Sequence, residues 1–328
     1  MKSEGLSPSQ RREPRGQPAL FSVVLPALNE SASLPHTIDS VLTWCGQRGL
    51  TAEVVVVDDG STDDTVGVIR RLQASRPVVL VQLSRNFGKE AALTAGLAHA
   101  RGDVVVLMDA DGQHPIELLD DMLQHWRAGA DQVVGVLEQR QGTPWLQRLS
   151  VKAFYAIVNR RSRFQVPADA GDFRLLDRRV VDTLLSLPER TRFMKGLYAW
   201  AGFPTVLLPY QPLARHAGDT HFNRAALAGL ALDGLTAFSD WPLRLANWLG
   251  TACAIASVAA ASWFIFEHYW YGTDVPGWST VVVLQTLLGA AQLICLGILS
   301  AYVSRIFQEA KQRPLYVVQD VHRPQDAA

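Results

Sequence analysis

The chain has 328 residues, and its 31 lysines and arginines are balanced by 31 aspartates and glutamates, so its formal net charge is zero. This balance argues against a nucleic-acid partner, because general nucleic-acid binders carry a basic excess that displaces counterions from phosphates. Three cysteines lie far apart without a Cys-x-x-Cys pattern: Cys45, Cys253 and Cys295. Their number and spacing exclude a disulfide framework and a structural zinc site.

The N-terminal half alternates short β-branched runs with amphipathic segments of helical length. The first 18 residues have no apolar run and predict a disordered tail over residues 1–18. The expected strands that follow are FSVVLP, AEVVVVD, PVVLVQL, GDVVVLMD and DQVVGVL, which begin at residues 21, 52, 77, 102 and 131. Continuous apolar strands separated by helices are typical of a mostly parallel sheet that is covered on both faces. The fold class is therefore α/β.

Two long stretches of the C-terminal third contain no charged residue, residues 245–266 and 275–304. At about 1.5 Å per residue the first stretch alone reaches ~33 Å, enough for a hydrocarbon core of ~30 Å. Tryptophans and tyrosines gather near their ends, as in an interfacial aromatic belt. We expect a two-helix transmembrane hairpin, with helices over residues 243–267 and 276–305.

The charges that flank these stretches predict an orientation. Basic residues precede the first span and follow the second, namely Arg224, Arg244, Arg305, Lys311 and Arg313. The loop between the spans has no lysine or arginine, so the positive-inside rule places it outside and both termini in the cytoplasm. An amphipathic juxtamembrane segment is expected over residues 221–242, and a cytoplasmic C-terminal tail over residues 306–328.

Acidic residues follow two of the expected strands. Asp58 and Asp59 end one strand, and Asp109 and Asp111 end another. Ligands of open parallel sheets bind beyond the carboxyl ends of the strands, so one pocket can collect both pairs. Either Asp58 or Asp59 could accept a hydrogen bond from a base or a ribose. The sequence has neither a G-x-G-x-x-G nor a P-loop motif, which argues against a dinucleotide dehydrogenase and a P-loop NTPase.

The spacing of Asp109 and Asp111 suits a divalent metal. If the chain stays extended, both carboxylates project to one side and can bind Mg²⁺ or Mn²⁺ together with a diphosphate, with Gln113 as a neutral oxygen ligand. An Asp-x-Asp pair is a weak signal by itself, because acidic residues at a strand–helix junction also form turns and favour helix starts.

Eight sequence blocks, in order, carry a resemblance to a known family. They are VVLPALNE (23–30), VVDDGSTDDT (56–65), SRNFGKEAALTAGL (84–97), MDADGQHP (108–115), AGDFRLLDRRVV (170–181), LPERTRFMKGLYAWAGF (187–203), ALDGLTAFSDWPLR (231–244) and YVSRIFQEAKQRPLYVV (302–318). Together they resemble glycosyltransferase family 2, and within it the polyprenyl-phosphate group of bactoprenol glucosyltransferases and dolichol-phosphate mannosyltransferases. The resemblance implies a GT-A-like nucleotide-diphospho-sugar transferase domain over residues 19–220.

The resemblance also implies site residues. The nucleotide sugar would contact Pro26, Leu28, Glu30, Asp58, Asp109, Ala110, Asp111, Gln113, Arg215 and His221. The metal would be held by Asp109, Asp111 and Gln113, and the catalytic residues would be Asp111, Asp172 and Arg215. Asp172 either borders the reacting centre or holds Arg174.

One departure from the family pattern concerns the charge at the diphosphate. The family motif R-x-A-G-x-[ST]-K-[WY] reads RHAGDTHF at residues 215–222, so Arg215 is retained and His221 replaces the usual lysine. Histidine is only partly charged near neutral pH, which predicts weaker or pH-dependent diphosphate binding. Smaller departures are Gly112, Leu137 and Phe222.

The expected reaction transfers a sugar from a nucleotide diphosphate sugar to undecaprenyl phosphate at the cytoplasmic face of the bacterial inner membrane. A phosphate monoester is largely dianionic near neutral pH, so it needs no strong general base, and its in-line attack inverts the anomeric carbon. Candidates for holding this phosphate are Arg190, Arg192 and Lys195.

Two alternatives stay open, and the subunit number is not fixed. A processive polysaccharide synthase is disfavoured because its Q-x-x-R-W motif is absent. A membrane-anchored nucleotide-sugar binding or scaffold protein with a degenerate site is favoured only by His221. Relatives assemble through their membrane hairpins, so we expect a homo-oligomer.

Overall fold

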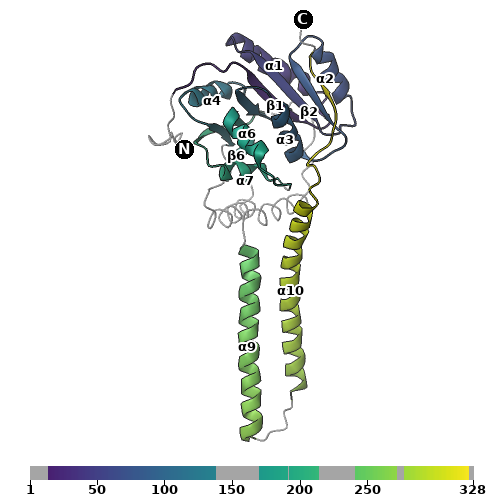
Figure 1. The fold of residues 1–328 in the computed structure, drawn as a ribbon, viewed down its shortest axis with the longest axis vertical. Coiled ribbons are helices and arrows are strands. Elements are labelled where there is room, and N and C mark those ends of the chain that lie inside the picture. Colours follow the sequence, from purple (N-terminus) through teal and green to yellow (C-terminus); the bar gives the residue numbers. More distant parts are fainter. Residues whose placement is uncertain (1–13, 138–169, 191, 214–240, 272–276, 325–328) are drawn as a thin grey trace. The chain divides into compact units, whose positions relative to one another are not determined.

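The computed structural model describes residues 14–137, 170–190, 192–213, 241–271 and 277–324. The chain divides into two compact units, Met1–Gly229 with Pro314–Ala328, and Leu230–Arg313. The strands of the first unit are β1 (Phe21–Ala27), β2 (Ala52–Asp58), β3 (Val78–Leu83), β4 (Val104–Leu107), β5 (Gln132–Leu137), β6 (Ala170–Asp177), β7 (Thr205–Tyr210) and β8 (Val318–His322). Its helices are α1 (Leu34–Gln47), α2 (Thr65–Gln73), α3 (Lys89–His99), α4 (Leu118–Arg127), α6 (Arg178–Ser186) and α7 (Met194–Trp200) (Figure 1).

The described strands form one sheet in the order β7-β5-β6-β4-β1-β2-β3-β8. Parallel pairing joins β1 to β2 and β4, β2 to β3, and β5 to β7. Strands β6 and β8 run antiparallel to their neighbours. The prediction of a mostly parallel α/β sheet is confirmed, and the five predicted strands correspond to β1 to β5.

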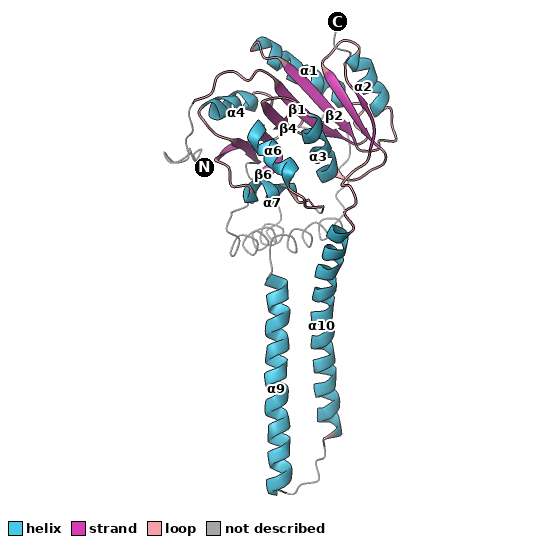
Figure 2. Cartoon of the chain, viewed as in Figure 1, coloured by secondary structure: helices cyan, strands magenta, loops and turns pink. Residues whose placement is uncertain are grey.

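Helices cover both faces of the sheet (Figure 2). Val23 and Leu25 of β1 belong to a buried cluster with residues of α1, α2 and α4. Val24, which lies between these two residues in β1 and on the opposite face of the sheet, packs against α3 at Gly96. Helices α3 and α6 contact each other, and α6 also contacts β6 and β4. This alternation follows from the two-residue repeat of a strand and explains why the central strands read as continuous apolar runs.

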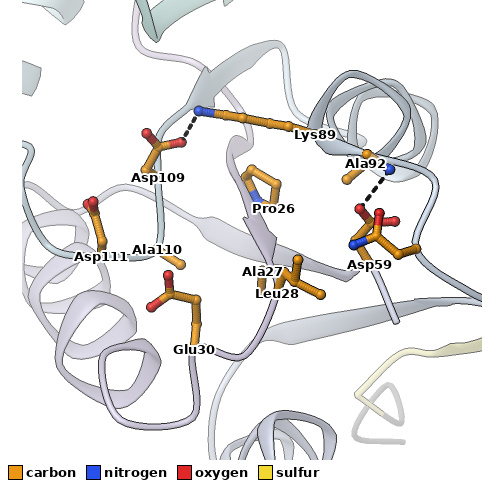
Figure 3. Close-up of a pocket in the computed structure, with 12 residues that line it drawn as sticks. Pro26, Ala27, Leu28, Glu30, Asp59, Lys89, Ala92, Asp109, Ala110 and Asp111 are labelled. Atoms are coloured by element: carbon orange, nitrogen blue, oxygen red, sulfur yellow. Dashed lines mark hydrogen bonds and ion pairs between the residues drawn. The ribbon is translucent and has the colours of Figure 1, made fainter. Parts of the chain in front are cut away.

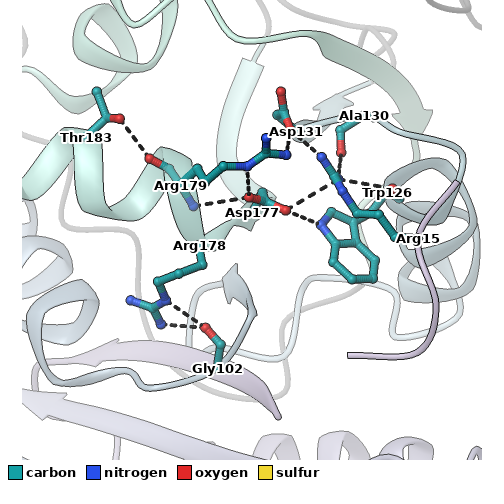
Figure 4. A network of polar contacts seen from close by, with 9 residues as sticks. All are labelled: Arg15, Gly102, Trp126, Ala130, Asp131, Asp177, Arg178, Arg179 and Thr183. Atoms are coloured by element: carbon teal, nitrogen blue, oxygen red, sulfur yellow. Dashed lines mark hydrogen bonds and ion pairs between the residues drawn. The ribbon is translucent and has the colours of Figure 1, made fainter. Parts of the chain in front are cut away.

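The N-terminal prediction was wrong for the part of the tail that the structure describes. Arg15 donates from Nη1 to the carbonyl of Ala130 at 2.7 Å and pairs through Nη2 with the fully buried Asp131 (Figure 4). Asp177 lies 3.4 Å from the same guanidinium and accepts a hydrogen bond from the indole of Trp126 at 2.9 Å. A buried carboxylate needs a cation, and Arg15 of the segment before β1 supplies one together with Arg179 of α6, which is 2.9 Å from Asp131 Oδ1.

The segment predicted as a C-terminal tail contains regular structure. Helix α10 continues to Ala310, and β8 follows within the segment that the sequence predicts as a tail over residues 306–328. Val321 of β8 pairs with Val81 of β3, and Ser84 donates to the carbonyl of Val317 at 3.0 Å. The segment therefore covers the open edge of β3, which would otherwise present unpaired backbone groups.

The second unit consists of two long helices, α9 (Trp241–Tyr271, 31 residues) and α10 (Trp278–Ala310, 33 residues). They lie side by side, and Cys295 Sγ of α10 is 3.4 Å from the carbonyl oxygen of Ala246 in α9. Of the described helices, α10 has the length and apolarity to cross a membrane over Leu284–Ala310, while the apolar part of α9, Ala246–Ala260, is shorter. The two helices of the prediction are present, and one of them meets the requirement for a span. The predicted juxtamembrane segment lies almost entirely outside the described residues.

Candidate active site

A cavity of about 260 Å³ opens where the carboxyl ends of β1, β2 and β4 meet the start of α3 (Figure 3). Its lining includes six residues that the sequence predicts for the nucleotide sugar, Pro26, Leu28, Glu30, Asp109, Ala110 and Asp111. The place agrees with the rule for open parallel sheets. The cavity thus gathers residues from separate strands at one edge of the sheet.

The loops after β1 and β2 fix each other. Asn29, whose φ is 57°, accepts a hydrogen bond from the backbone N–H of Thr62 at 2.8 Å and donates its own N–H to Ser61 Oγ at 3.0 Å. The N–H of Glu30 donates to Thr65 Oγ1 at 3.0 Å. Asparagine tolerates this left-handed conformation better than most residues, which suits it to the turn. These bonds hold Leu28 and Glu30 at the cavity wall.

Of the two aspartates that end β2, Asp59 lines the cavity and Asp58 does not. The Asp59 carboxylate accepts hydrogen bonds from the N–H groups of Phe87 at 2.7 Å and Gly88 at 2.9 Å. Burial raises the pKa of Asp59, although these two bonds oppose the shift. Asp58 is only 1% exposed and accepts from the N–H of Ser61 at 3.2 Å. The predicted base or ribose contact of Asp58 therefore stays a prediction.

Asp109 and Asp172 lie side by side because of the antiparallel register of β4 and β6. Leu107, the last residue of β4, pairs with Arg174 of β6; Asp109 follows Leu107 by two residues, and Asp172 precedes Arg174 by two residues in β6. The ammonium of Lys89 stands between them, 2.6 Å from Asp109 Oδ1 and 2.8 Å from Asp172 Oδ2. Lys89 was not among the predicted site residues.

The charges of this trio stabilise one another. Burial opposes ionisation of all three, but their attraction outweighs it. The pKa of Lys89 is raised by Asp109 and Asp172 against the effect of burial. The pKa of Asp109 is held low by His114 and Lys89, and that of Asp172 by Lys89 and Lys195, again against burial. His114 Nε2 is 3.7 Å from Asp109 Oδ2, beyond hydrogen-bond range, so Lys89 is the direct partner. Both aspartates are ionised at neutral pH.

Glu90, the neighbour of Lys89 in α3, behaves differently. Its Oε2 accepts a hydrogen bond from the N–H of Met194 at 3.0 Å. Burial and the negative charge of Asp172 raise the pKa of Glu90 to about 7, against the opposing effects of the Met194 bond, Lys195 and Lys89. Glu90 therefore titrates near neutral pH, close to the reaction centre that we propose below.

The alternative role of Asp172 is to hold Arg174, and the charge of Asp172 does favour the Arg174 cation, although the direct contacts of the Arg174 guanidinium are with other groups. The buried Arg174 donates from Nη2 to the carbonyl of Gly171 at 2.8 Å, and its guanidinium lies 3.7 Å from the ring centroid of Tyr198. The ion-pair partner of Asp172 is Lys89.

The three residues predicted for the acceptor phosphate lie in two places. Arg190 and Arg192 line a second cavity of about 630 Å³ with residues of α3, the end of α6 and the segment Pro314–Tyr316. Arg192 Nη2 donates to the carbonyl of Leu187 at 2.9 Å. Lys195 instead acts on the charges of Asp172 and Glu90. Arg215 and His221 lie outside the described residues.

The donor set at the first cavity fits a divalent cation of the magnesium type. Glu30, Asp109 and Asp111 bring carboxylate oxygens to one cavity, and Mg²⁺ in proteins often takes one or two carboxylates and completes its shell with water and phosphate oxygens. Asp111 Oδ1 accepts a hydrogen bond from the N–H of Gln113 at 3.1 Å, while the Gln113 side chain does not line this cavity. Across the described part of the chain, no three histidine, cysteine, aspartate or glutamate residues form a metal cluster. Asp109 and Asp111 are the residues that could bind such an ion.

Comparison with known proteins decides the family. The family model for glycosyl transferase family 2 matches residues 22–185. An uncharacterized glycosyltransferase of Synechocystis sp. is 40% identical over 302 residues, which cover 92% of this chain and 95% of the relative. A prophage-derived bactoprenol glucosyl transferase of Shigella flexneri is 38% identical over 304 residues, covering 92% of this chain and 98% of the relative. The chain belongs to glycosyltransferase family 2. It is a glycosyltransferase, and its α/β unit is the GT-A-like domain of that family.

Solved structures of related shape are more distant from this glycosyltransferase. A mannosyltransferase of Pyrobaculum calidifontis in complex with GDP-Man and Mn²⁺ is 18% identical and covers 92% of this chain and 88% of its own, with a TM-score of 0.47. A TM-score below 0.5 at this identity does not bear on function.

Sequence reasoning missed one charged residue that lines the first cavity, Lys89, and left Asp59 as an alternative to Asp58. Lys89 lies within the quoted block 84–97, and its one distinguishing signal is a cation at the first position of a helix, where the helix dipole disfavours it. Asp59 could not be separated from Asp58, because adjacent residues at a strand end point in opposite directions and the strand pattern does not say which faces the ligand.

Proposed function

We propose that this glycosyltransferase transfers a hexose from a nucleotide diphosphate sugar, UDP-glucose-like or GDP-mannose-like, to undecaprenyl phosphate, with inversion at the anomeric carbon. The product would be a polyprenyl-phosphate sugar for the modification of cell-envelope glycans or lipids. The observation that carries the proposal is the acidic cavity at the carboxyl ends of β1, β2 and β4. The bactoprenol glucosyl transferase name of the Shigella relative supports the polyprenyl acceptor.

The proposed acceptor needs no base from the protein, because it carries its own charged nucleophile. The pKa of Asp172 is held low, so this group is a carboxylate at neutral pH and cannot act as a general acid there. A lipid phosphate monoester is already largely dianionic at neutral pH. The work of the protein is then to orient the acceptor, stabilise the departing nucleoside diphosphate and exclude water.

Asp109 and Asp111 are the proposed ligands of Mg²⁺ or Mn²⁺, with Gln113 as a third candidate. When bound, the ion would neutralise charge on the diphosphate oxygens. Pro26, Leu28, Glu30, Asp58 and Ala110 are proposed for the nucleotide sugar, and Arg215 and His221 for the diphosphate. Asp111, Asp172 and Arg215 are the proposed catalytic residues, and Arg190, Arg192 and Lys195 are proposed for the acceptor phosphate.

The proposed location is the bacterial inner membrane, with two spans and the catalytic unit and both termini in the cytoplasm. Helix α10 supports one span, and the flanking basic residues support the orientation. A membrane anchor keeps the enzyme beside an acceptor that cannot leave the bilayer. Assembly as a homo-oligomer is part of this proposal.

The test is transfer of label into lipid. The full-length enzyme in detergent is incubated with undecaprenyl phosphate, Mn²⁺ or Mg²⁺ and a series of radiolabelled nucleotide sugars, and label in the organic phase is counted. We expect lipid-linked label from one donor, and its loss with EDTA. Binding of nucleotide without transfer from any donor would contradict the proposal and favour a binding protein with a degenerate site.

A further inference from the structure

Lys89 has the position of a functional residue rather than that of an ordinary helical lysine. It is the first residue of α3, where the helix dipole disfavours a cation. Its side chain is 44% exposed, but its ammonium is held between two carboxylates. Those carboxylates belong to Asp109, which follows the end of β4 by two residues, and to Asp172 of the neighbouring antiparallel strand β6.

Without Lys89, two ionised carboxylates would lie close together with no cation between them. Like charges at so short a separation repel each other. A cation between them removes the repulsion, so one role of Lys89 is to hold the ends of β4 and β6 in their observed arrangement. This role alone would be structural.

The charge of the cavity points to a second role. Its lining carries four carboxylates, of Glu30, Asp59, Asp109 and Asp111. Among the described residues that line it, Lys89 has the one basic side chain. A diphosphate is itself an anion, and its entry into an acidic cavity requires positive charge to face it.

We propose that Lys89 is a donor-binding residue whose ammonium binds the diphosphate of the nucleotide sugar while it holds Asp109 beside Asp172. This inference rests on the proposed nucleotide-diphosphate donor. Lys89 thus adds a cation to those that the family motif supplies.

The experiment measures nucleotide binding separately from transfer. Calorimetry of the full-length protein in detergent compares UDP and GDP with the corresponding monophosphates, each in EDTA and in Mn²⁺. The variants are Lys89→Met and Lys89→Arg. The matched control is Arg71→Met, which removes the cation of an exposed ion pair with Asp64 on α2, where both side chains are about two-thirds exposed. Thermal unfolding of each variant reports whether it folds.

We expect Lys89→Met to weaken binding of the diphosphate in EDTA by about tenfold or more, the usual effect of losing a charge-assisted hydrogen bond. Binding of the monophosphate should change much less, Lys89→Arg should recover most of the affinity, and Arg71→Met should match the unaltered protein. The transfer assay should show a raised KM for the donor in Lys89→Met.

If Lys89→Met weakens the binding of diphosphate and monophosphate equally, the proposal is overturned and the role of Lys89 is structural. An unchanged diphosphate affinity in Lys89→Met would also overturn it. If Lys89→Met does not fold, Lys89→Gln, which keeps a polar side chain, takes its place. A fall in its ratio of diphosphate to monophosphate affinity supports the proposal, and an unchanged ratio overturns it. The binding result stands even if no transfer to undecaprenyl phosphate is found, so failure of the proposed acceptor is distinguishable from failure of this inference.

Discussion

Glu90 and Lys89 are neighbours in the first turn of α3, but the surroundings of Lys89 favour its charged form, whereas those of Glu90 disfavour its charged form. Lys89 lies between two carboxylates that favour its cation. Glu90 is partly buried near Asp172, and its pKa rises from the ordinary 4.5 to about 7. Folding therefore changes the proton affinity of Glu90 between pH 4.5 and about 7, and stability must depend on pH in this range.

The sign of this dependence is fixed by the direction of the shift. Between pH 4.5 and 7 the folded protein holds a proton that the unfolded chain has lost, so the stabilising contribution is full below pH 4.5 and is lost as pH rises through 7. Glu90→Gln keeps an acceptor for the N–H of Met194 and removes the titration. We expect the melting temperature of the unaltered protein to fall by about 2–4 °C more than that of Glu90→Gln between pH 5 and pH 8. Parallel profiles for the two proteins would contradict this assignment.

At the level of single residues, the sequence predicts the acidic strand ends but not their cation. The alternation of apolar runs and the Asp-x-Asp spacing place Asp109 and Asp111 at one sheet edge, and both line the cavity. The link between Lys89 and Asp172 depends on the antiparallel register of β6, which no local pattern near Lys89 reports. The separation of Lys195 from Arg190 and Arg192 depends in the same way on tertiary packing.

Among the elements, β1 to β5 were predictable and β6 to β8 were not. The first five are apolar runs that helices bury on both faces. Strand β6 carries Asp172, Arg174 and Asp177, which interrupt its apolar pattern although it lies inside the sheet. Strands β7 and β8 are at the two edges of the sheet, where a strand need not be apolar throughout. The sequence of β8, VQDVH, is mostly polar. Because these strands carry polar residues at the site or at the sheet edge, they lack the continuous apolar run that identifies β1 to β5.

The packing of α3 on the sheet gives a prediction at this scale. A Cβ at Gly96 would overlap Val24 Cγ1 of β1, so the helix approaches the sheet at a position where only glycine fits. We expect Gly96→Ala to destabilise the protein by about 1–3 kcal/mol, as overpacking usually does. The double variant with Val24→Ala should recover part of the loss, because it removes the overlapping methyl group.

Gly46 is the matched control for this prediction. It also lies in a helix, α1, but a Cβ there would meet no atom within 4 Å. Gly46→Ala should be neutral or stabilise by about 0.5–1 kcal/mol through helix propensity. Thermal unfolding of the four proteins in detergent measures these differences. Equal effects of the alanines at Gly96 and Gly46 would show that close packing of α3 does not limit stability.

For the whole molecule, zero net charge hides an uneven distribution of charged residues along the chain. The two stretches at residues 245–266 and 275–304 carry none, and the basic residues that flank them predict which side each end faces. Helix α10 meets the requirement for one span, whereas the apolar part of α9 is shorter. The sequence therefore predicts two membrane spans, and the number of helices that cross the membrane can be measured.

Cysteine labelling measures how many helices cross the membrane. In a variant without native cysteines, Asp274→Cys tests the loop between the helices and Ser75→Cys tests the exposed end of α2. With two spans, a membrane-impermeant maleimide should label residue 274 in intact cells and residue 75 only after permeabilisation. Labelling of both residues only after permeabilisation would contradict the two-span topology.

The most direct test of the central claim compares Asp111→Asn with Asp121→Asn in transfer of labelled sugar to undecaprenyl phosphate. Asp111 lines the cavity, whereas Asp121 is exposed on α4 outside it. We expect Asp111→Asn to lower the initial rate by about a hundredfold or more, as expected for loss of a group that stabilises charge in the transition state, while Asp121→Asn keeps the full rate. Equal rates for the two variants would contradict the claim that this cavity performs the transfer.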